Sequence, residues 1–248
     1  MLSCQVLLMQ IKNSALKNSY NKVGNLTWVH DDFLKENISK SRSLFETLSL
    51  NSKSPQPKKF NVIGLLSGLP FPLNIQNMLV KVQADIKDII GNEQIYFVEP
   101  PNLGIEYYVF KWPNDQDLTK NMLNLSKKIF NEIVARHKAF SIEVKGIQIN
   151  PDGCIIAKGF PYENDFFEIR DFVKNTFNYA SSQNQSNWMH IPLGRILNPV
   201  GVRKFKLLRK YITSMNDFSF YLKISSIHLI HEKRWYMTEK DYILSSEL

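Results

Sequence analysis

Cysteine is nearly absent from this sequence of 248 residues, which contains only Cys4 and Cys154. Two cysteines this far apart, in no metal-binding spacing, argue against a disulfide framework and favour a reducing compartment. No apolar run approaches the roughly 20 residues that span a bilayer. The apolar segment Leu2–Ile11 lacks the charged start and the small-residue cleavage site of a signal peptide. We therefore expect a cytoplasmic protein without a membrane partner.

Histidine is also scarce, with five residues in the chain. His228 and His231 are three positions apart but have no third ligand nearby, and His30 and His137 are isolated. Zinc sites use three or four such ligands. The sequence therefore predicts no metal site and no cofactor.

The composition is that of a globular protein, with 44% hydrophobic and 12% aromatic residues. The formal net charge of +8 favours an anionic partner such as RNA, a nucleotide or a phosphorylated ligand, although solubility alone explains many basic proteins. We expect a monomer.

The chain divides into an N-terminal extension, residues 1–59, and a main domain, residues 60–248. Asp31 and Asp32 can cap a helix over about Phe33–Leu50. The segment Asn51–Lys59 contains two prolines and reads as a linker. We expect the extension to pack on the main domain as an additional helix.

The hydrophobic pattern of the main domain predicts alternating strands and helices, and its polar residues 178–187 predict a loop. A turn at Asn150–Gly153 joins two strands into a hairpin. The expected strands are Phe60–Leu66, Ile95–Val98, Ile105–Trp112, Phe140–Ile149, Cys154–Phe160, His190–Ile196, Phe218–His231 and Arg234–Met237. The expected helices are Leu73–Ile90, Leu118–His137, Phe166–Phe177 and Val202–Met215.

One module occurs twice in this order. The strand Ile105–Phe110, a helix and the strand Phe140–Ile149 are echoed by His190–Ile196, a helix and the strands Phe218–Ile230. Helices and antiparallel hairpins in this arrangement predict an α+β protein. We expect a bilobal, duplicated fold in which two antiparallel sheets flank a central cleft and the helices lie outside.

The repeat and the stretch His190-Ile191-Pro192-Leu193-Gly194-Arg195 resemble the two-histidine (2H) phosphoesterase superfamily, which includes RNA 2′,3′-cyclic phosphodiesterases also called 2′-5′ RNA ligases. The resemblance covers roughly residues 60–245. In that family each lobe supplies a His-apolar-Thr/Ser-apolar strand. One imidazole takes a proton from the attacking group and the other protonates the leaving oxygen, while the two hydroxyl groups bind the phosphate.

This sequence departs from the family pattern at three positions. Glu106 stands at the first histidine position and Tyr108 at the first hydroxyl position, while Pro192 replaces the second hydroxyl residue. The resemblance thus implies His190 and Glu106 as the catalytic pair. A carboxylate on a strand can also simply face solvent, and a lone histidine can be an ordinary structural residue.

Four further residues are candidates for binding the substrate. Tyr108 offers a hydroxyl or a ring, or packs in the core. Arg195 carries a charge near His190, but strict strand alternation sends residues five positions apart to opposite faces. Lys206 and Arg209 belong to the expected helix Val202–Met215, which is rich in basic residues. This helix provides either a path for a nucleic-acid backbone or a solvated face.

The resemblance implies a protein that acts on, or recognises, an RNA-derived or nucleotide phosphodiester of the 2′,3′-cyclic phosphate type, with weakened or altered catalysis. Two alternatives remain open. One is a non-catalytic RNA- or nucleotide-binding module, and the other is a scaffold for protein interactions. A cleft filled by Tyr108, Trp188 or the N-terminal segment favours the scaffold.

Overall fold

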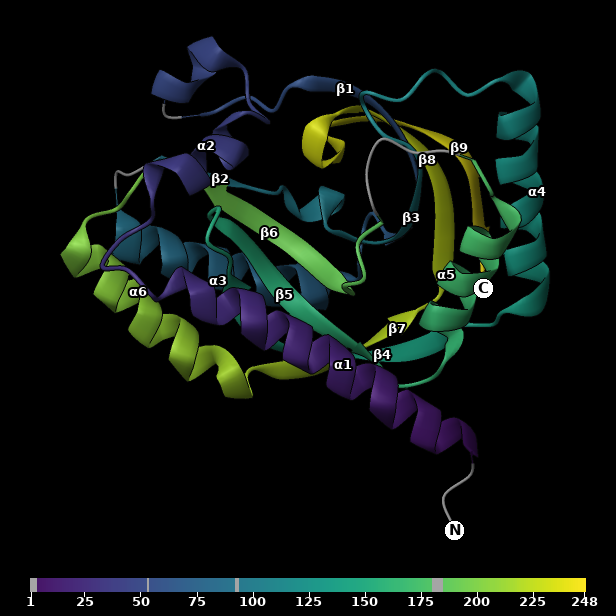
Figure 1. The fold of residues 1–248 in the computed structure, drawn as a ribbon, viewed down its shortest axis with the longest axis horizontal. Helices are drawn as coiled ribbons and strands as arrows, with labels where there is room; N and C mark the ends of the chain where they lie inside the picture. The colour runs from purple at the N-terminus through teal and green to yellow at the C-terminus, as the bar shows by residue number, and fades with distance from the viewer. Residues whose placement is uncertain (1–3, 53, 92–93, 180–184) are drawn as a thin grey trace.

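The protein is built from two antiparallel sheets with helices packed against them (Figure 1). The computed structural model describes residues 4–52, 54–91, 94–179 and 185–248. The first sheet contains, in spatial order, β3 (Gly104–Lys111), β1 (Lys59–Gly68), β8 (Ser226–Arg234) and β9 (Glu239–Glu247). The second contains β2 (Ile95–Phe97), β6 (His190–Ile196), β5 (Cys154–Pro161), β4 (Phe140–Ile149) and β7 (Ser219–Ile224). The expected α+β class with two antiparallel sheets is confirmed.

Two pairs of helices cover the sheets. The pair α4 (Lys120–Arg136) and α5 (Asp165–Thr176) packs on the first sheet, and the pair α3 (Leu73–Ile90) and α6 (Val202–Ser214) packs on the second. One apolar side of α3 is buried, and Gly91, at φ 63°, ends this helix in a conformation that suits glycine. At the start of α4, the side chain of Thr119 accepts a hydrogen bond from the Met122 amide at 3.3 Å.

Each sheet therefore has a face turned toward its helices and an opposite face, here called the inner face. In the first sheet, Ser67 and Tyr107 lie on the helix side. Their hydroxyl groups are 2.9 Å apart, and the Tyr107 ring packs 5.2 Å from the ring of Phe166 on α5. The turn after β8 carries Tyr236, which reaches across to the inner face of the second sheet and contacts Tyr96 of β2, ring to ring, at 5.1 Å. The two inner faces are thus turned toward each other.

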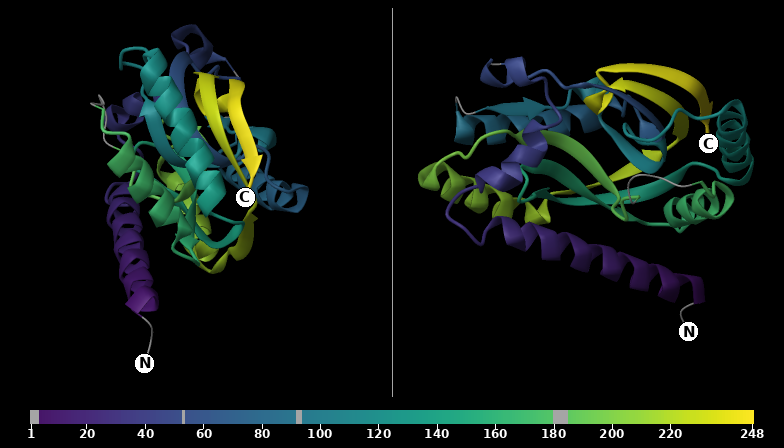
Figure 2. Two further views of the ribbon diagram at one scale, coloured as in Figure 1. Left: turned by 90° about the vertical axis from the view of Figure 1, so that its right-hand side faces the viewer. Right: turned by 45° about the horizontal axis from the view of Figure 1, so that its top comes forward.

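The N-terminal segment differs from its prediction. A single helix over Phe33–Leu50 is wrong: this stretch forms α2 (Lys35–Arg42) and the separate 3₁₀ turn η1 (Thr47–Asn51). A longer helix, α1 (Cys4–Thr27), precedes them and contacts β4 and β5. Figure 2 shows α1 running along one side of the molecule. Its apolar residues crowd near its start and leave no continuous stripe along the helix, so the sequence did not reveal it.

The C-terminal strand is also corrected. A strand over Arg234–Met237 is wrong, because β8 ends at Arg234 and the next three residues form the 3₁₀ turn η4 (Trp235–Met237). Tyr236 and Met237 have φ of 62° and 58°, which breaks the extended conformation. The true closing strand is β9, which pairs with β8 at the edge of the first sheet.

Two further predicted segments are only partly covered by the described residues. The polar loop predicted over 178–187 includes residues 180–184, and the linker over 51–59 includes residue 53, all of which lie outside the described residues. Within the part of the chain that is described, no helix is both long and apolar enough to cross a membrane.

Candidate functional site

Glu106 lies on the inner face of the first sheet. It pairs with Leu66 of β1, which pairs in turn with His228 of β8. Glu232 pairs with Val62, four residues before Leu66 on the same strand. Because alternate residues of a strand share a face, Glu106, His228 and Glu232 lie on one face, opposite Ser67. This face therefore carries two carboxyl groups and one imidazole.

Both carboxyl groups bind protons more tightly than usual. Burial raises the pKa of Glu106 to about 7, and the positive charge of Arg170 on α5 opposes the rise. Burial likewise raises the pKa of Glu232 to about 8, although the Met237 amide donates a hydrogen bond to its Oε1 at 3.0 Å. A carboxyl group with a pKa near 7 can donate or accept a proton at neutral pH.

His190 begins β6 in the second sheet, where it pairs with Lys158 of β5. Burial, together with the charges of Arg170 and Arg195, lowers the pKa of His190 to about 4. Its Nδ1 is buried and finds no hydrogen-bond partner among the described residues. The imidazole is therefore neutral at physiological pH.

Arg170 links the two candidate catalytic residues, because its charge lowers the pKa of both Glu106 and His190. Its Nε donates a hydrogen bond to the Tyr107 carbonyl oxygen at 2.8 Å, and its guanidinium lies 4.8 Å from the centre of the Phe166 ring. Glu106 in one sheet and His190 in the other thus lie within electrostatic range of one cation.

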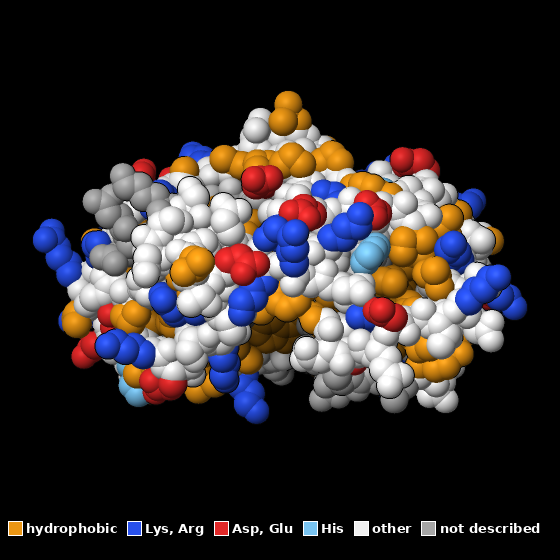
Figure 3. All heavy atoms as spheres, turned by 90° about the horizontal axis from the view of Figure 1, so that it is seen from above, with side chains coloured by type: hydrophobic (Ala, Val, Ile, Leu, Met, Phe, Trp, Pro, Cys, Tyr) orange, Lys and Arg blue, Asp and Glu red, His pale blue; other side chains and the backbone are white. Residues whose placement is uncertain are grey.

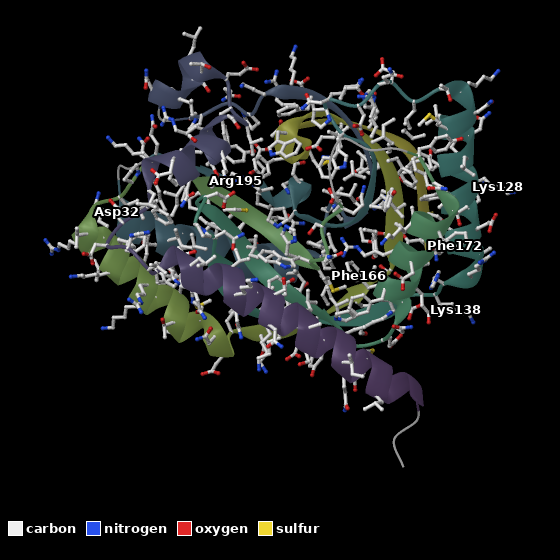
Figure 4. The ribbon with its side chains drawn as sticks, in the orientation of Figure 1. Asp32, Lys128, Lys138, Phe166, Phe172 and Arg195 are labelled. Carbon is white, nitrogen blue, oxygen red and sulfur yellow. The ribbon has the colours of Figure 1, made fainter. Side chains whose placement is uncertain are left out.

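Arg195 shares the inner face of the second sheet with His190. Cys154, Ile156 and Lys158 alternate along β5 and pair with Arg195, Pro192 and His190 respectively. A bulge in β6 inserts one extra residue between Pro192 and Gly194, so the expectation of opposite faces is wrong. Figure 4 shows Arg195 near α2.

The Arg195 guanidinium is already engaged by protein groups. It forms an ion pair with Asp152 at 2.7 Å and donates hydrogen bonds to Ser41 Oγ, at 2.7 Å, and to the Tyr236 hydroxyl. These contacts join α2 and the turn after β8 to the second sheet. Arg195 thus holds three parts of the chain together beside His190.

Aromatic side chains cover His190. The ring of Trp188 lies 6.1 Å from that of His190, and Tyr20 of α1 packs 4.8 Å from Trp188. Tyr20 is fully buried and donates its hydroxyl hydrogen to the Met189 carbonyl oxygen. Trp188 Nε1 donates to Ser19 Oγ at 2.7 Å. Helix α1 therefore lies over the face that carries His190.

Lys206 and Arg209 lie on the solvent-exposed side of α6. Phe205, Leu208 and Ile212 form the buried side of this helix. On the face of the molecule shown in Figure 3, basic and acidic side chains are interspersed. The basic residues Lys206 and Arg209 of α6 are thus exposed and do not line the inner faces.

No group of three or more histidine, cysteine, aspartate or glutamate side chains that could hold a metal ion occurs within the described part of the chain. Cys154 is buried in the second sheet, and burial raises the pKa of its thiol. A buried thiol with a raised pKa is a poor nucleophile.

Solved structures resemble this arrangement over most of the chain. TT0787 of Thermus thermophilus is 12% identical, with a TM-score of 0.55 over 75% of this chain and 97% of that one. ATU0111 of Agrobacterium tumefaciens, a conserved protein of unknown function, is 14% identical, with a TM-score of 0.50 over 84% of this chain and 97% of that one. The chain has the two-histidine phosphoesterase fold.

Escherichia coli LigT, solved in complex with 3′-AMP, is also similar, at 10% identity and a TM-score of 0.47 over 77% of this chain and 99% of that one. No protein-family model and no curated protein matches the chain. At these identities the likeness concerns the 2H fold and leaves the activity to the residues of the site.

The two hydroxyl positions of the 2H pattern are both altered. Pro192 shares the face of His190 but has no group that can donate a hydrogen bond. Tyr108 pairs with Leu65 while Glu106 pairs with Leu66, so an irregularity in β3 removes Tyr108 from the face of Glu106. Tyr108 is 8% exposed and packs against Phe110 at 5.3 Å.

The sequence did not single out Arg170 or Tyr20, although Arg170 acts on Glu106 and His190 and Tyr20 packs on Trp188. Arg170 lies in an amphipathic helix where any charged residue looks solvent-exposed, and Tyr20 lies in a helix that was not predicted. Glu232 lies four residues after His228 on β8, and this even spacing is a sequence signal that could have placed both on one face.

Proposed function

We propose that this protein binds an RNA-derived or nucleotide phosphodiester, of the 2′,3′-cyclic phosphate type, between its two sheets, and that Glu106 and His190 transfer the protons of its hydrolysis. One observation carries the proposal. The cation Arg170 acts on a carboxyl group whose pKa is about 7 and on an imidazole whose pKa is about 4. At neutral pH, one group can donate a proton and the other can accept one.

The proposed reaction uses water as the nucleophile. Neutral His190 takes a proton from the water as its oxygen attacks phosphorus. Protonated Glu106 gives its proton to the ribose oxygen as the bond from that oxygen to phosphorus breaks. An imidazole whose conjugate acid has a pKa of about 4 is a weak base. Turnover should therefore be slower than with two ordinary histidines.

A non-catalytic protein is the second candidate, supported by the cover over His190. Trp188 and Tyr20 pack over the imidazole, and α1 lies on its face of the sheet. A cleft occupied in this way supports a scaffold whose N-terminal helix is part of the fold.

Hydrolysis of 2′,3′-cyclic AMP separates these functions. His190→Ala and Glu106→Gln should each lower the rate about 10²–10⁴-fold, the usual contribution of a general acid or base. His30→Ala and Glu163→Gln alter exposed residues of the same types and should leave the rate unchanged.

The outcomes differ for each function. Binding of the nucleotide by wild type without turnover supports the binding module, and absence of binding supports the scaffold. Full activity of Glu106→Gln would show that the first motif is misplaced and that the acid lies elsewhere on the inner faces.

A further inference from the structure

A cavity of about 860 Å³ lies between α1, α5, β3 and the residues that lead into β6. Its walls include Tyr107 and Tyr108, which follow Glu106, and Trp188, which precedes His190 by two positions. Glu106 and His190 are not among the lining residues, but Arg170, whose charge acts on both of them, is. Its volume lies in the usual range for pockets that hold small ligands.

Arg170 lines this cavity together with two lysines, Lys12 and Lys174. The Tyr107 carbonyl oxygen fixes its Nε and the Phe166 ring supports its plane, so the orientation of the guanidinium is set by the protein. Arg170 forms no ion pair with a carboxylate of the described residues. Buried charges are normally paired, and a planar guanidinium matches the oxygens of a phosphate group.

Helix α1 forms the opposite wall. Lys12, Ala15, Leu16 and Ser19 line the cavity from this helix. Lys12 pairs with Asp171 of α5 at 3.5 Å and lies 4.8 Å from the centre of the Phe167 ring. This pair joins the two walls, so the N-terminal helix closes a space that α5 and β3 would leave open.

We propose that Arg170 binds the phosphate of a mononucleotide-sized ligand in this cavity, and that α1 limits the site to ligands of that size. The inference rests on the proposed function for the identity of the reacting phosphate. In the 2H pattern two hydroxyl groups bind the phosphate. Here Arg170 takes over that role and holds the phosphate near Glu106 and His190. The base has Tyr108 and Trp188 as aromatic surfaces, and a long RNA strand is excluded by α1.

Calorimetric binding of 2′,3′-cyclic AMP, with adenosine as a ligand that lacks phosphate, tests the role of Arg170. Arg170→Met should weaken binding of the cyclic nucleotide about 10–100-fold, as expected for loss of a charge-assisted hydrogen bond, and should leave adenosine binding unchanged. Arg170→Lys, which keeps the charge, should fall between the two. Lys128→Met removes an exposed charge on α4 (Figure 4) and serves as the control.

A steric variant tests the wall formed by α1. Ala15 is exposed and lines the cavity, so Ala15→Trp should obstruct ligand binding without loss of folding. Asn18→Trp adds the same side chain at an exposed position of α1 outside the lining and should bind as wild type does. Melting temperatures of all variants would separate lost binding from lost folding.

The results distinguish this inference from the proposed function. If Arg170→Met loses binding and wild type shows no turnover, the inference stands and hydrolysis does not. Wild-type binding by folded Arg170→Met, beside loss of turnover in His190→Ala, would overturn the inference and keep the function. Equal binding of Ala15→Trp and Asn18→Trp, or tight binding of long single-stranded RNA that displaces the nucleotide, would remove α1 as the size limit.

Discussion

His190 and Arg195 lie on the same face of the second sheet, although five positions separate them on β6. The bulge between Pro192 and Gly194 turns the strand so that Arg195 faces Asp152, Ser41 and Tyr236. The charge of Arg195 consequently lowers the pKa of His190. One bulge thus places the cation that anchors α2 on the face that carries His190.

Replacing Arg195 should destabilise the fold. Arg195→Met leaves Asp152 and two hydroxyl groups without their cation, which should lower the free energy of unfolding by about 2–4 kcal/mol. Urea denaturation measures the change. The control Arg136→Met breaks an exposed ion pair with Glu132 and should cost less than about 1 kcal/mol. An equal cost for both variants would contradict the anchoring role.

Glu232 makes stability depend on pH in a direction opposite to that of most carboxylates. Its pKa rises from 4.5 to about 8 on folding, so the folded protein holds a proton that the unfolded chain has released. Stability is therefore lost as pH increases from 4.5 to about 8.

The variant Glu232→Gln keeps an acceptor for the Met237 amide but cannot ionise. Relative to wild type, it should be more stable by about 1–3 kcal/mol at about pH 9 and nearly equal at about pH 4. Thermal melts across this range measure the difference. Glu163→Gln, at an exposed position, should show no such trend, and a constant difference for Glu232→Gln would refute the assignment.

Tyr20 should contribute measurably to the attachment of α1. Tyr20→Phe removes the hydroxyl that donates to the Met189 carbonyl oxygen, which keeps its hydrogen bond from the Gly159 amide, so the cost should be about 1 kcal/mol. Tyr162→Phe changes a tyrosine that is 61% exposed and should cost less than about 0.5 kcal/mol. Chemical denaturation compares the two. If they are equal, the buried hydroxyl does not stabilise the helix.

The basic face of α6 should affect long RNA and not small nucleotides. Replacing both Lys206 and Arg209 with alanine should reduce the slope of log affinity against log salt by about 1–2 for single-stranded RNA. Binding of 2′,3′-cyclic AMP should stay unchanged, because neither side chain lines the cavity. Salt-independent RNA binding by wild type would show that α6 is only a solvated surface.

Much of the core fold was predictable because its signals are local. The strand Phe140–Ile149 and the helix Leu73–Ile90 occur with the expected bounds, since a period of two or 3.6 residues with clear stops determines each. The closing strand β9 was missed because Glu239–Glu247 is polar and pairs along one edge only. The position of β9 depends on its pairing with β8, and no local sequence pattern reveals that pairing.

The site was less predictable than the fold. The sequence resemblance suggested Glu106 and His190 as a pair, but the facing of Tyr108 and Arg195 depends on irregularities in β3 and β6 that shift alternation by one residue. Arg170 comes from a helix about 64 positions after Glu106 in the chain, yet its charge acts on both Glu106 and His190. Such contacts arise only from tertiary packing.

The most direct test of the account is the pH dependence of kcat/KM for hydrolysis of 2′,3′-cyclic AMP. The rate should rise as His190 loses its proton near pH 4 and fall as Glu106 loses its proton near pH 7, which gives a maximum between these values. Glu106→Gln should remove the fall on the alkaline side together with most of the activity. A maximum above pH 7, or an unchanged profile in Glu106→Gln, would contradict the assignment of Glu106 as the acid and His190 as the base.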